Sequence, residues 1–171
     1  MHLPSLSKQC LHNYVGAQCP PCMNLIMDSS FQLKVLTVNC QGLGDPNKRR
    51  DVFKILKTKN YNIYFIQDTH FIQEDENLIQ TQWGYKAFFS SYKSNSRGVA
   101  ILFNNNCEIT IHEQYRDDNG NYLILDVIVE NLHFLLINIY GPNSDKPEFY
   151  SQLLNTLQDI YSSQCIILGG D

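Results

Sequence analysis

The stretch from residue 33 to residue 67 constrains the fold more than any other part of the chain. Short apolar runs at 33–38 and 63–67 predict two buried strands, and the amphipathic residues between them predict one helix. Two strands joined by a crossover helix are almost always parallel neighbours in one sheet. The stretch therefore indicates an α/β layer architecture.

The helix between these strands has a clear start. Asp45 is a favourable N-cap residue and Pro46 suits the first helical position, so we expect the helix to run from there to about Lys59. Its apolar spacing predicts four buried side chains, which are those of Val52, Phe53, Ile55 and Leu56.

The middle of the chain has a different pattern, in which strand-like runs alternate with turns and no helix fits between them. These runs lie at 85–89, 97–103, 108–115, 121–130 and 133–140. The pair Asn119-Gly120 is typical of a type I′ hairpin, and apolar residues alternate with polar ones after it. We therefore expect an antiparallel meander with one buried face.

The two ends of the chain differ from each other. A second helix begins at Pro147, and a further buried strand is expected at 165–168. The stripe that this helix should bury consists of Phe149, Leu153, Leu154, Leu157, Ile160 and Tyr161. Residues 1–31 show no period, so we expect a poorly ordered extension that includes the pair Cys19 and Cys22. The remaining residues, 32–171, end on a strand with apolar faces uncovered, which predicts an incomplete domain.

Charge and hydropathy exclude two classes of protein. The formal net charge of −4 excludes a strongly basic nucleic-acid binder, so any contact with phosphate must be local or mediated by a metal. The longest apolar runs have about five to seven residues, against roughly 20 for a membrane-spanning helix. The amino terminus has no secretory-signal pattern and the six cysteines are scattered, so we expect an intracellular protein without a disulfide framework.

Polar side chains follow four of the apolar strands. They are Asn39, Asp68, Tyr140 with Asn138 just before it, and Asp171. Sites in α/β proteins are built at the carboxyl ends of strands. Carboxylate, amide and hydroxyl oxygens suit Mg²⁺ rather than zinc, and such a cluster could support hydrolysis of a phosphodiester.

Six segments, taken together and in order, resemble one known superfamily. They are LKVLTVNCQGL, KRRDVFKILK, IYFIQDTH, SRGVAILF, LINIYGPN and IILGGD. They resemble the endonuclease/exonuclease/phosphatase superfamily, and most closely the amino-terminal part of the apurinic-type endonuclease domain of non-LTR retrotransposons. The resemblance implies a four-layer α/β sandwich of the deoxyribonuclease-I-like type, with mixed sheets flanked by helices, here truncated.

The resemblance also implies roles for the polar residues. Asn39 and Tyr140 would contact the scissile phosphate, Asp68 would bind Mg²⁺ or alternatively Mn²⁺, and Asp171 would polarise the attacking water. DNA is the implied partner, bound weakly by this chain, and a longer relative would carry a fused reverse transcriptase and act in the nucleus. Contacts with DNA are expected from Lys48, Arg49, Arg50, Arg97 and Asn143.

Two departures from the superfamily pattern affect these expectations. Asp68 stands where the motif has a Glu, and its carboxylate lies one methylene closer to the backbone, so metal binding should be weaker. The motif also continues beyond Asp171 with an Asn, a later Asp and a Ser-Asp-His segment. We therefore expect an amino-terminal fragment of a Mg²⁺-dependent DNA endonuclease from a retrotransposon polyprotein.

Two alternatives remain open at this point. The chain could be a catalytically inactive remnant or interaction module that keeps part of the sheet. Within the same superfamily, it could also come from a phosphatase that acts on small phosphoesters.

Overall fold

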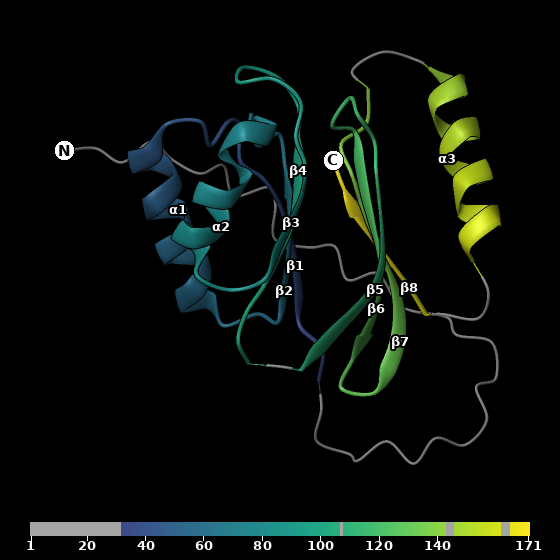
Figure 1. The fold of residues 1–171 in the computed structure, drawn as a ribbon, viewed down its shortest axis with the longest axis horizontal. Helices are drawn as coiled ribbons and strands as arrows, with labels where there is room; N and C mark the ends of the chain where they lie inside the picture. The colour runs from purple at the N-terminus through teal and green to yellow at the C-terminus, as the bar shows by residue number, and fades with distance from the viewer. Residues whose placement is uncertain (1–31, 107, 143–145, 162–164) are drawn as a thin grey trace.

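The computed structural model describes residues 32–106, 108–142, 146–161 and 165–171. In these residues, two four-stranded sheets pack face to face, and helices cover their outer faces (Figure 1). The strand orders are β1-β2-β4-β3 and β5-β6-β7-β8, and each sheet contains parallel and antiparallel pairs. The predicted four-layer α/β sandwich with mixed sheets is confirmed. Residues 1–31, which include the pair Cys19 and Cys22, fall outside the described residues.

The first strand–helix–strand unit is built as the sequence predicts. Strands β1 (Val35–Asn39) and β2 (Ile63–Gln67) are parallel, and helix α1 (Pro46–Lys59) joins them. The side chain of Asp45 caps the helix by accepting a hydrogen bond from the backbone N–H of Lys48 at 2.7 Å. The N-cap and the N-terminal proline therefore position the loop that leads from β1 into α1.

The buried face of α1 differs in part from the prediction. Phe53 and Leu56 are buried, and Val52 is partly buried against the same cluster. Ile55 was expected inside but is 48% exposed, because it lies on the side of the helix that faces away from the sheet. Arg49 takes a buried position instead, with 3% exposure.

A second helix on the same face was not predicted. Helix α2 (Glu76–Trp83) follows a 3₁₀ turn (Gln73–Asp75) and is short, so the sequence offers little periodicity to detect it. Trp83 is fully buried, packs edge-on against Phe53 at 5.2 Å between ring centroids, and donates its indole N–H to the carbonyl of Phe103 at 2.8 Å. Trp83, together with the buried Ile79, holds α2 beside α1.

The next two strands join the first sheet rather than a separate meander. Strand β3 (Ala87–Ser90) pairs with β4 (Val99–Phe103), and β4 pairs antiparallel with β2. The prediction of one continuous meander from residue 85 to 140 is therefore wrong. Fully buried β4 lies at the centre of the first sheet, where every residue is covered on both faces.

The second sheet contains the remaining strands. Strands β5 (Ile109–Arg116), β6 (Tyr122–Val129) and β7 (Leu132–Ile139) form the antiparallel meander. Helix α3 (Pro147–Ile160) then leads to β8 (Cys165–Gly170), which runs parallel to β7. This unit repeats the strand–helix–strand arrangement of the first sheet on the opposite side of the molecule (Figure 1).

The turn between β5 and β6 is longer than predicted. Gly120 has a φ of 67°, whereas Asn119 keeps a negative φ, so the type I′ assignment is wrong. Residues 117–121 form the connection, and the carboxylate of Asp117 accepts hydrogen bonds from the backbone and side-chain amides of Asn121.

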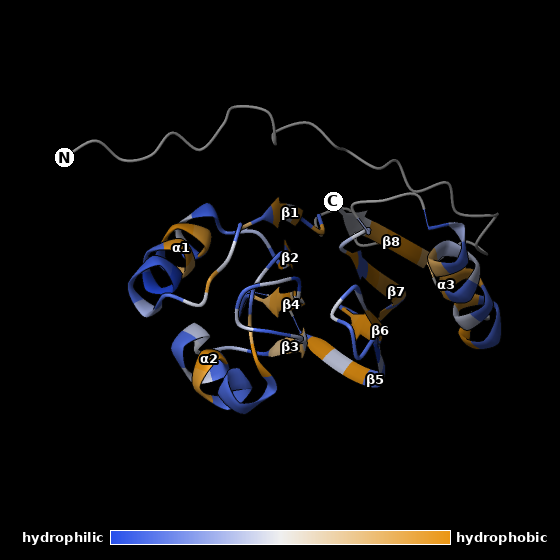
Figure 2. Cartoon of the chain, turned by 90° about the horizontal axis from the view of Figure 1, so that it is seen from above, coloured by the Kyte–Doolittle hydropathy of each residue, from blue (hydrophilic) through white to orange (hydrophobic). Residues whose placement is uncertain are grey.

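The outer face of the second sheet is only partly covered by α3. Leu153 is buried, but Leu154 is 58% exposed and Tyr161 is 43% exposed, so the predicted stripe is too broad. Strand β8 was expected to be buried, yet Ile166 and Leu168 are 43% and 47% exposed because they lie on the outer face of the sheet, which α3 covers only in part. In Figure 2 the ribbon of β8 is coloured as hydrophobic along most of its length and lies beside α3.

The core between the sheets holds one buried polar bridge. Asn138 on β7 is fully buried, and its side-chain oxygen accepts a hydrogen bond from the Gln67 amide of β2 at 2.6 Å. Its Nδ2 donates to the carbonyls of Ile66 and Ala100 at 3.0 and 2.9 Å. Asn138 therefore joins the two sheets and does not belong to an exposed site.

Strand β8 packs closely against β2 of the other sheet. A Cβ built on Gly169 would lie 2.4 Å from a ring carbon of Phe65, so only glycine fits that position.

Among the described residues, no helix is both long and apolar enough to cross a membrane.

Candidate functional site

Four polar residues expected at strand ends gather at one end of the sandwich. Asn39 ends β1 and Asp68 follows β2, whereas Tyr140 follows β7 and Asp171 follows β8. Because β1 and β2 are parallel, as are β7 and β8, the carboxyl ends of each pair lie at one edge. The tertiary structure then brings the two edges together.

The closest link between the two edges joins Asn39 to Asp171. The Nδ2 of Asn39 donates to Oδ2 of Asp171 at 2.7 Å, while the Oδ1 of Asn39 accepts from the backbone N–H of Gln41 at 2.9 Å. The backbone of Asp171 donates to the carbonyl of Ile139 and accepts from the N–H of Gly141, at 3.1 and 2.9 Å. Both ends of the link are thus held by backbone contacts.

Tyr140 lies between the two carboxylates of the site. Burial raises the pKa of its hydroxyl, and the negative charges of Asp68 and Asp171 and a hydrogen-bonding contact with Asp68 raise it further. The positive charge of Arg97 acts in the opposite direction and lowers this pKa. The Tyr140 hydroxyl therefore remains protonated at neutral pH and serves as a hydrogen-bond donor.

Asp68 is the most enclosed carboxylate of the site, with a side chain that is 16% exposed. Its Oδ1 lies 2.9 Å from Nε2 of His70, and both residues adopt a left-handed backbone, with φ values of 52° and 58°. The carbonyl of Asp68 accepts the N–H of Gly42 at 2.7 Å, which ties this loop to the one after β1. His70 was not among the site residues predicted from the sequence, since a lone histidine after a strand carries no signal of its own.

A free thiol also lies at this end of the first sheet. Cys40 directly follows Asn39, and burial raises the pKa of its thiol to about 12, while the nearby Lys48 lowers it and Asp68 raises it. A thiol in this environment is protonated at neutral pH and is a poor nucleophile. The chemistry available here is therefore that of oxygen ligands and hydrogen-bond donors.

The basic residues expected to contact DNA have different environments. The ammonium group of Lys48 donates to the carbonyls of Cys40 and Gln41 at 2.9 and 2.8 Å. Arg50 is exposed, with its Nε 3.8 Å from the carboxylate of Asp51. Asn143 falls outside the described residues.

The side chain of Arg49 is buried and makes hydrogen bonds within the protein. It donates from Nη1 to the carbonyls of Leu43 and Gly44 at 2.8 and 3.2 Å, and from Nε to the side chain of Gln82 at 2.7 Å. Burial lowers the pKa of the Arg49 guanidinium, while Asp75 and Asp45 oppose that shift. The side chain is directed into the protein and braces the loop after β1, so it does not offer its charge to a DNA phosphate.

The oxygen donors of the site fit a hard divalent cation. Asp68 and Asp171 supply carboxylates around the Tyr140 hydroxyl, and Asn39 supplies an amide. Mg²⁺ typically uses one or two carboxylates and keeps several waters, so this donor set suits it. Within the described ranges, no group of three or more His, Cys, Asp or Glu residues is arranged to hold a metal ion by itself.

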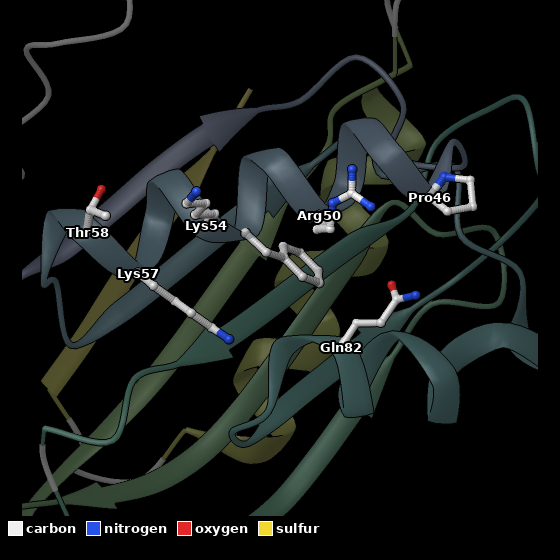
Figure 3. A pocket seen from close by; sticks show the side chains of 7 residues that line it. Pro46, Arg50, Lys54, Lys57, Thr58 and Gln82 are labelled. Atoms are coloured by element: carbon white, nitrogen blue, oxygen red, sulfur yellow. The ribbon is translucent and has the colours of Figure 1, made fainter.

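A groove of about 590 Å³ lies elsewhere, between α1 and α2 on the outer face of the first sheet (Figure 3). Arg50, Lys54 and Lys57 line it, together with Gln82 at the α2 side. None of the four strand-end residues borders this groove. It is a separate basic surface and not part of the candidate site.

Comparisons with known proteins agree with this fold. No family model matches the chain. The chain is 27% identical over 141 residues to the Transposon TX1 uncharacterized 149 kDa protein of Xenopus laevis, a match that covers 81% of this chain and 11% of that protein.

Two solved structures share the arrangement of layers. The endonuclease domain of TRAS1, a telomere-specific non-LTR retrotransposon, superposes with a TM-score of 0.57 at 16% identity, covering 82% of this chain and 58% of that one. An endonuclease/exonuclease/phosphatase family protein from Bacteroides thetaiotaomicron has a TM-score of 0.61 at 12% identity, covering 81% and 62%. The chain thus spans less than two thirds of the length of each relative. It has the deoxyribonuclease-I-like fold of the endonuclease/exonuclease/phosphatase proteins and a sequence similar to that of a transposon protein.

Proposed function

We propose that this chain carries part of a Mg²⁺-dependent DNA endonuclease domain of retrotransposon type, which hydrolyses one phosphodiester bond. The observation that carries the proposal is the hydrogen bond between Asn39 and Asp171, with Asp68 and Tyr140 beside it. Four residues from distant parts of the sequence thus offer two carboxylates, an amide and a phenol to one small region. Such a group can hold a phosphate and a hard cation together.

Each residue has a proposed task that follows from its contacts. Tyr140 would turn its single O–H from Asp68 to a phosphate oxygen when substrate binds, since the phenol is protonated at neutral pH. Asp171 accepts a proton from the attacking water, and Asn39 orients that carboxylate through the 2.7 Å hydrogen bond. Asp68 is the proposed ligand for Mg²⁺ or Mn²⁺, and the bound cation would neutralise charge that develops on the phosphate.

The comparisons support a nucleic-acid substrate and a retroelement setting. TRAS1 is described as a retrotransposon with an endonuclease domain, and the TX1 protein comes from a transposon. By analogy, we propose DNA as the substrate, a longer polyprotein that includes a reverse transcriptase, and action in the nucleus. The matches cover 58% of the TRAS1 chain and 11% of the TX1 protein, so the activity of the whole proteins comes to this chain by analogy alone.

A catalytically inactive module is the second candidate. The observation in its favour is the contact between Asp68 and His70, which already engages one oxygen of the carboxylate proposed to bind the metal. A metal would have to compete with this contact or use the second oxygen.

Nicking of supercoiled plasmid in the presence of Mg²⁺ distinguishes the two candidates. The protein to be assayed is this chain joined to the segment of the TRAS1 endonuclease domain that it does not cover. We expect nicked circles with Mg²⁺, none with EDTA, and a loss of about 10²-fold or more in rate for Asp171→Ala.

A folding control keeps this assay decisive. Lys54→Ala, on the outer surface of α1, should nick at the rate of the parent protein. A joined protein that is folded by circular dichroism, binds Mn²⁺ and still fails to nick would support the inactive module instead.

A further inference from the structure

The loop between β3 and β4 carries a stacked group of side chains that the proposed function does not yet use. It spans residues 91–98 and rises at the end of the sandwich where the carboxyl terminus lies (Figure 1). The guanidinium carbon of Arg97 lies 5.1 Å from the centroid of the Tyr92 ring, and Nζ of Lys93 lies 4.8 Å from it. A bridge between Lys93 and Ser96 closes the tip of this loop.

Backbone hydrogen bonds tie this loop to the loop that holds Asp68. The N–H of His70 donates to the carbonyl of Arg97 at 2.8 Å, and the N–H of Tyr92 donates to the carbonyl of Phe71 at 3.1 Å. His70 in turn contacts the carboxylate of Asp68. The stacked pair is therefore fixed relative to the proposed metal ligand.

The same loop is also linked to Tyr140 through the turn between β5 and β6. The N–H of Tyr140 donates to the carbonyl of Asn121 at 2.7 Å, and the N–H of Gly98 donates to the carbonyl of the adjacent Gly120 at 3.1 Å. Arg97 is near enough to Tyr140 for its charge to act on the Tyr140 hydroxyl. Arg97 thus places a positive charge beside the carboxylates and the phenol of the site.

The backbone of Arg97 also favours a functional explanation. Its φ of 59° lies in the left-handed region, where a residue with a Cβ is disfavoured and glycine is preferred. Strained backbone of this kind is common at functional positions, and here Asp68 and His70 of the candidate site share it, as do Gln41 and Glu130. A planar guanidinium binds two oxygens of a phosphate at once, and an aromatic ring beneath it fixes its plane.

We propose that Arg97 grips the DNA phosphate at the site, and that Tyr92 is a positioning residue that holds the Arg97 guanidinium in place. This inference rests on the proposed function, because it assumes a DNA substrate at the same end of the sandwich. It adds the cation that the four strand-end residues lack, since Lys48 and Arg49 are engaged with backbone carbonyls.

Binding of a short fluorescein-labelled DNA duplex, measured by fluorescence anisotropy at several potassium chloride concentrations, tests the proposal with the full chain. We expect Arg97→Ala to weaken binding about tenfold, as for the loss of a charged hydrogen bond. The slope of log affinity against log salt concentration should also fall in magnitude by about 0.9, because one phosphate contact is lost. A change in folding alone would not alter this slope.

Tyr92 is tested through its dependence on Arg97. Tyr92→Phe keeps the ring and should bind as the parent chain does, whereas Tyr92→Leu should weaken binding. In a chain that already carries Arg97→Ala, Tyr92→Leu should cause no further loss. Equal losses in both backgrounds would mean that Tyr92 does not act through Arg97.

Two controls separate charge and stability from the proposed grip. Lys54→Ala removes one positive charge from the groove between α1 and α2 and should leave the affinity within twofold (Figure 3). Glycine adopts the left-handed backbone without strain, so Arg97→Gly should unfold at a urea concentration no lower than that of the parent chain. It should nevertheless bind DNA as weakly as Arg97→Ala does.

The outcomes also separate this inference from the proposed function. If the parent chain binds DNA, and Arg97→Ala keeps both the affinity and the dependence of affinity on salt concentration, the proposed contact between Arg97 and a DNA phosphate is wrong. The endonuclease proposal then still stands. If the folded parent chain does not bind DNA at low salt, the contact between Arg97 and DNA is overturned, and the endonuclease proposal is then decided by plasmid nicking with the joined protein.

Discussion

The side-chain amide of Asn39 donates a hydrogen bond to the carboxylate of Asp171, with 2.7 Å between Nδ2 and Oδ2, although 132 residues separate the two along the chain. Asn39 ends the first strand of one sheet, and Asp171 follows the last strand of the other. The contact therefore reports directly on how the two sheets are held together at the candidate site.

Introducing a second carboxylate at this contact should destabilise the chain in a salt-dependent way. In Asn39→Asp, two carboxylates would face each other and lower the free energy of unfolding by about 0.5 kcal/mol. Potassium chloride at about 1 M screens this repulsion. Urea denaturation at low and high salt measures this, and Asn39→Ala, which adds no charge, should show little of the salt dependence. An equal loss for both variants at both salt concentrations would mean that repulsion is not the cause.

Lengthening the proposed metal ligand should strengthen metal binding. Asp68→Glu moves the carboxylate about one methylene further from the backbone, so we expect tighter binding of Mn²⁺, and Asp68→Ala should bind more weakly than the parent. The electron paramagnetic resonance signal of free Mn²⁺ measures binding in the full chain without any need for activity. If all three chains bind equally, Asp68 is not a ligand.

The buried bridge at Asn138 should be sensitive to truncation. Asn138→Ala would leave the amide of Gln67 and two backbone carbonyls without their partner inside the core, which should cost about 2 to 4 kcal/mol of stability. Equilibrium urea denaturation measures the loss.

Adding Gln67→Leu to the Asn138→Ala chain tests the same bridge, because the second change removes an unpaired polar group. The double variant should lose less than the sum of the two single changes. Additive losses would show that the two side chains do not act as a pair.

Arg49 should matter for stability and not for DNA binding. Arg49→Ala removes hydrogen bonds to the carbonyls of Leu43 and Gly44 and to Gln82, so we expect a loss of about 1 to 3 kcal/mol. The affinity of the folded chain for a DNA duplex should stay within twofold. Arg50→Ala, an exposed neighbour on the same helix, serves as the matched control and should leave stability nearly unchanged. A large loss of affinity in a folded Arg49→Ala chain would restore Arg49 as a DNA contact.

Tyr140 should make the chain sensitive to alkali. Its pKa is raised in the folded state, first by burial and then by Asp68 and Asp171, above the ordinary value near 10 of the unfolded chain. The folded state therefore holds this proton more tightly. The resulting stability is fully present below pH 10 and is lost as the pH rises through the raised value.

Tyr140→Phe should remove this part of the alkaline loss in urea denaturation measured between about pH 8 and pH 11. The comparison is best made in a Tyr115→Phe background, because a hydrogen bond with Glu113 raises the pKa of Tyr115 to about 12 and would add its own loss. Identical pH profiles with and without the Tyr140 hydroxyl would contradict the assignment.

Several elements could be predicted from local sequence alone. The N-cap at Asp45, the proline that follows it and the apolar runs around it were sufficient for β1, α1 and β2, because each depends on neighbouring residues. The four strand-end residues were found in the same way, since a polar side chain after an apolar strand is visible in the sequence. The parallel pairing of the first two strands was predicted as well, whereas that of β7 with β8 came from the structure.

The features that the sequence did not predict depend on which other elements cover each strand or helix face. The spacing of apolar residues in the sequence carries no information about that. The sequence predicted β3 and β4 as part of the meander. In the structure they belong to the first sheet, because β4 pairs with β2 and β3 pairs with β4. Arg49 lies on a basic helix face in the sequence, yet loop carbonyls draw it into the protein. Ile166 and Leu168 are apolar and were expected to be buried, but they lie on the outer face of β8, which α3 covers only in part.

The sequence by itself determined the local elements and the chemical types of the candidate site residues, because short-range propensity, capping and alternation act within a few residues. The tertiary structure alone decided that Asn39 meets Asp171, that Asn138 becomes an internal bridge and that the charge of Arg97 acts on Tyr140. These contacts join segments far apart in the chain, and they form only when the apolar faces of the two sheets pack against each other and exclude water.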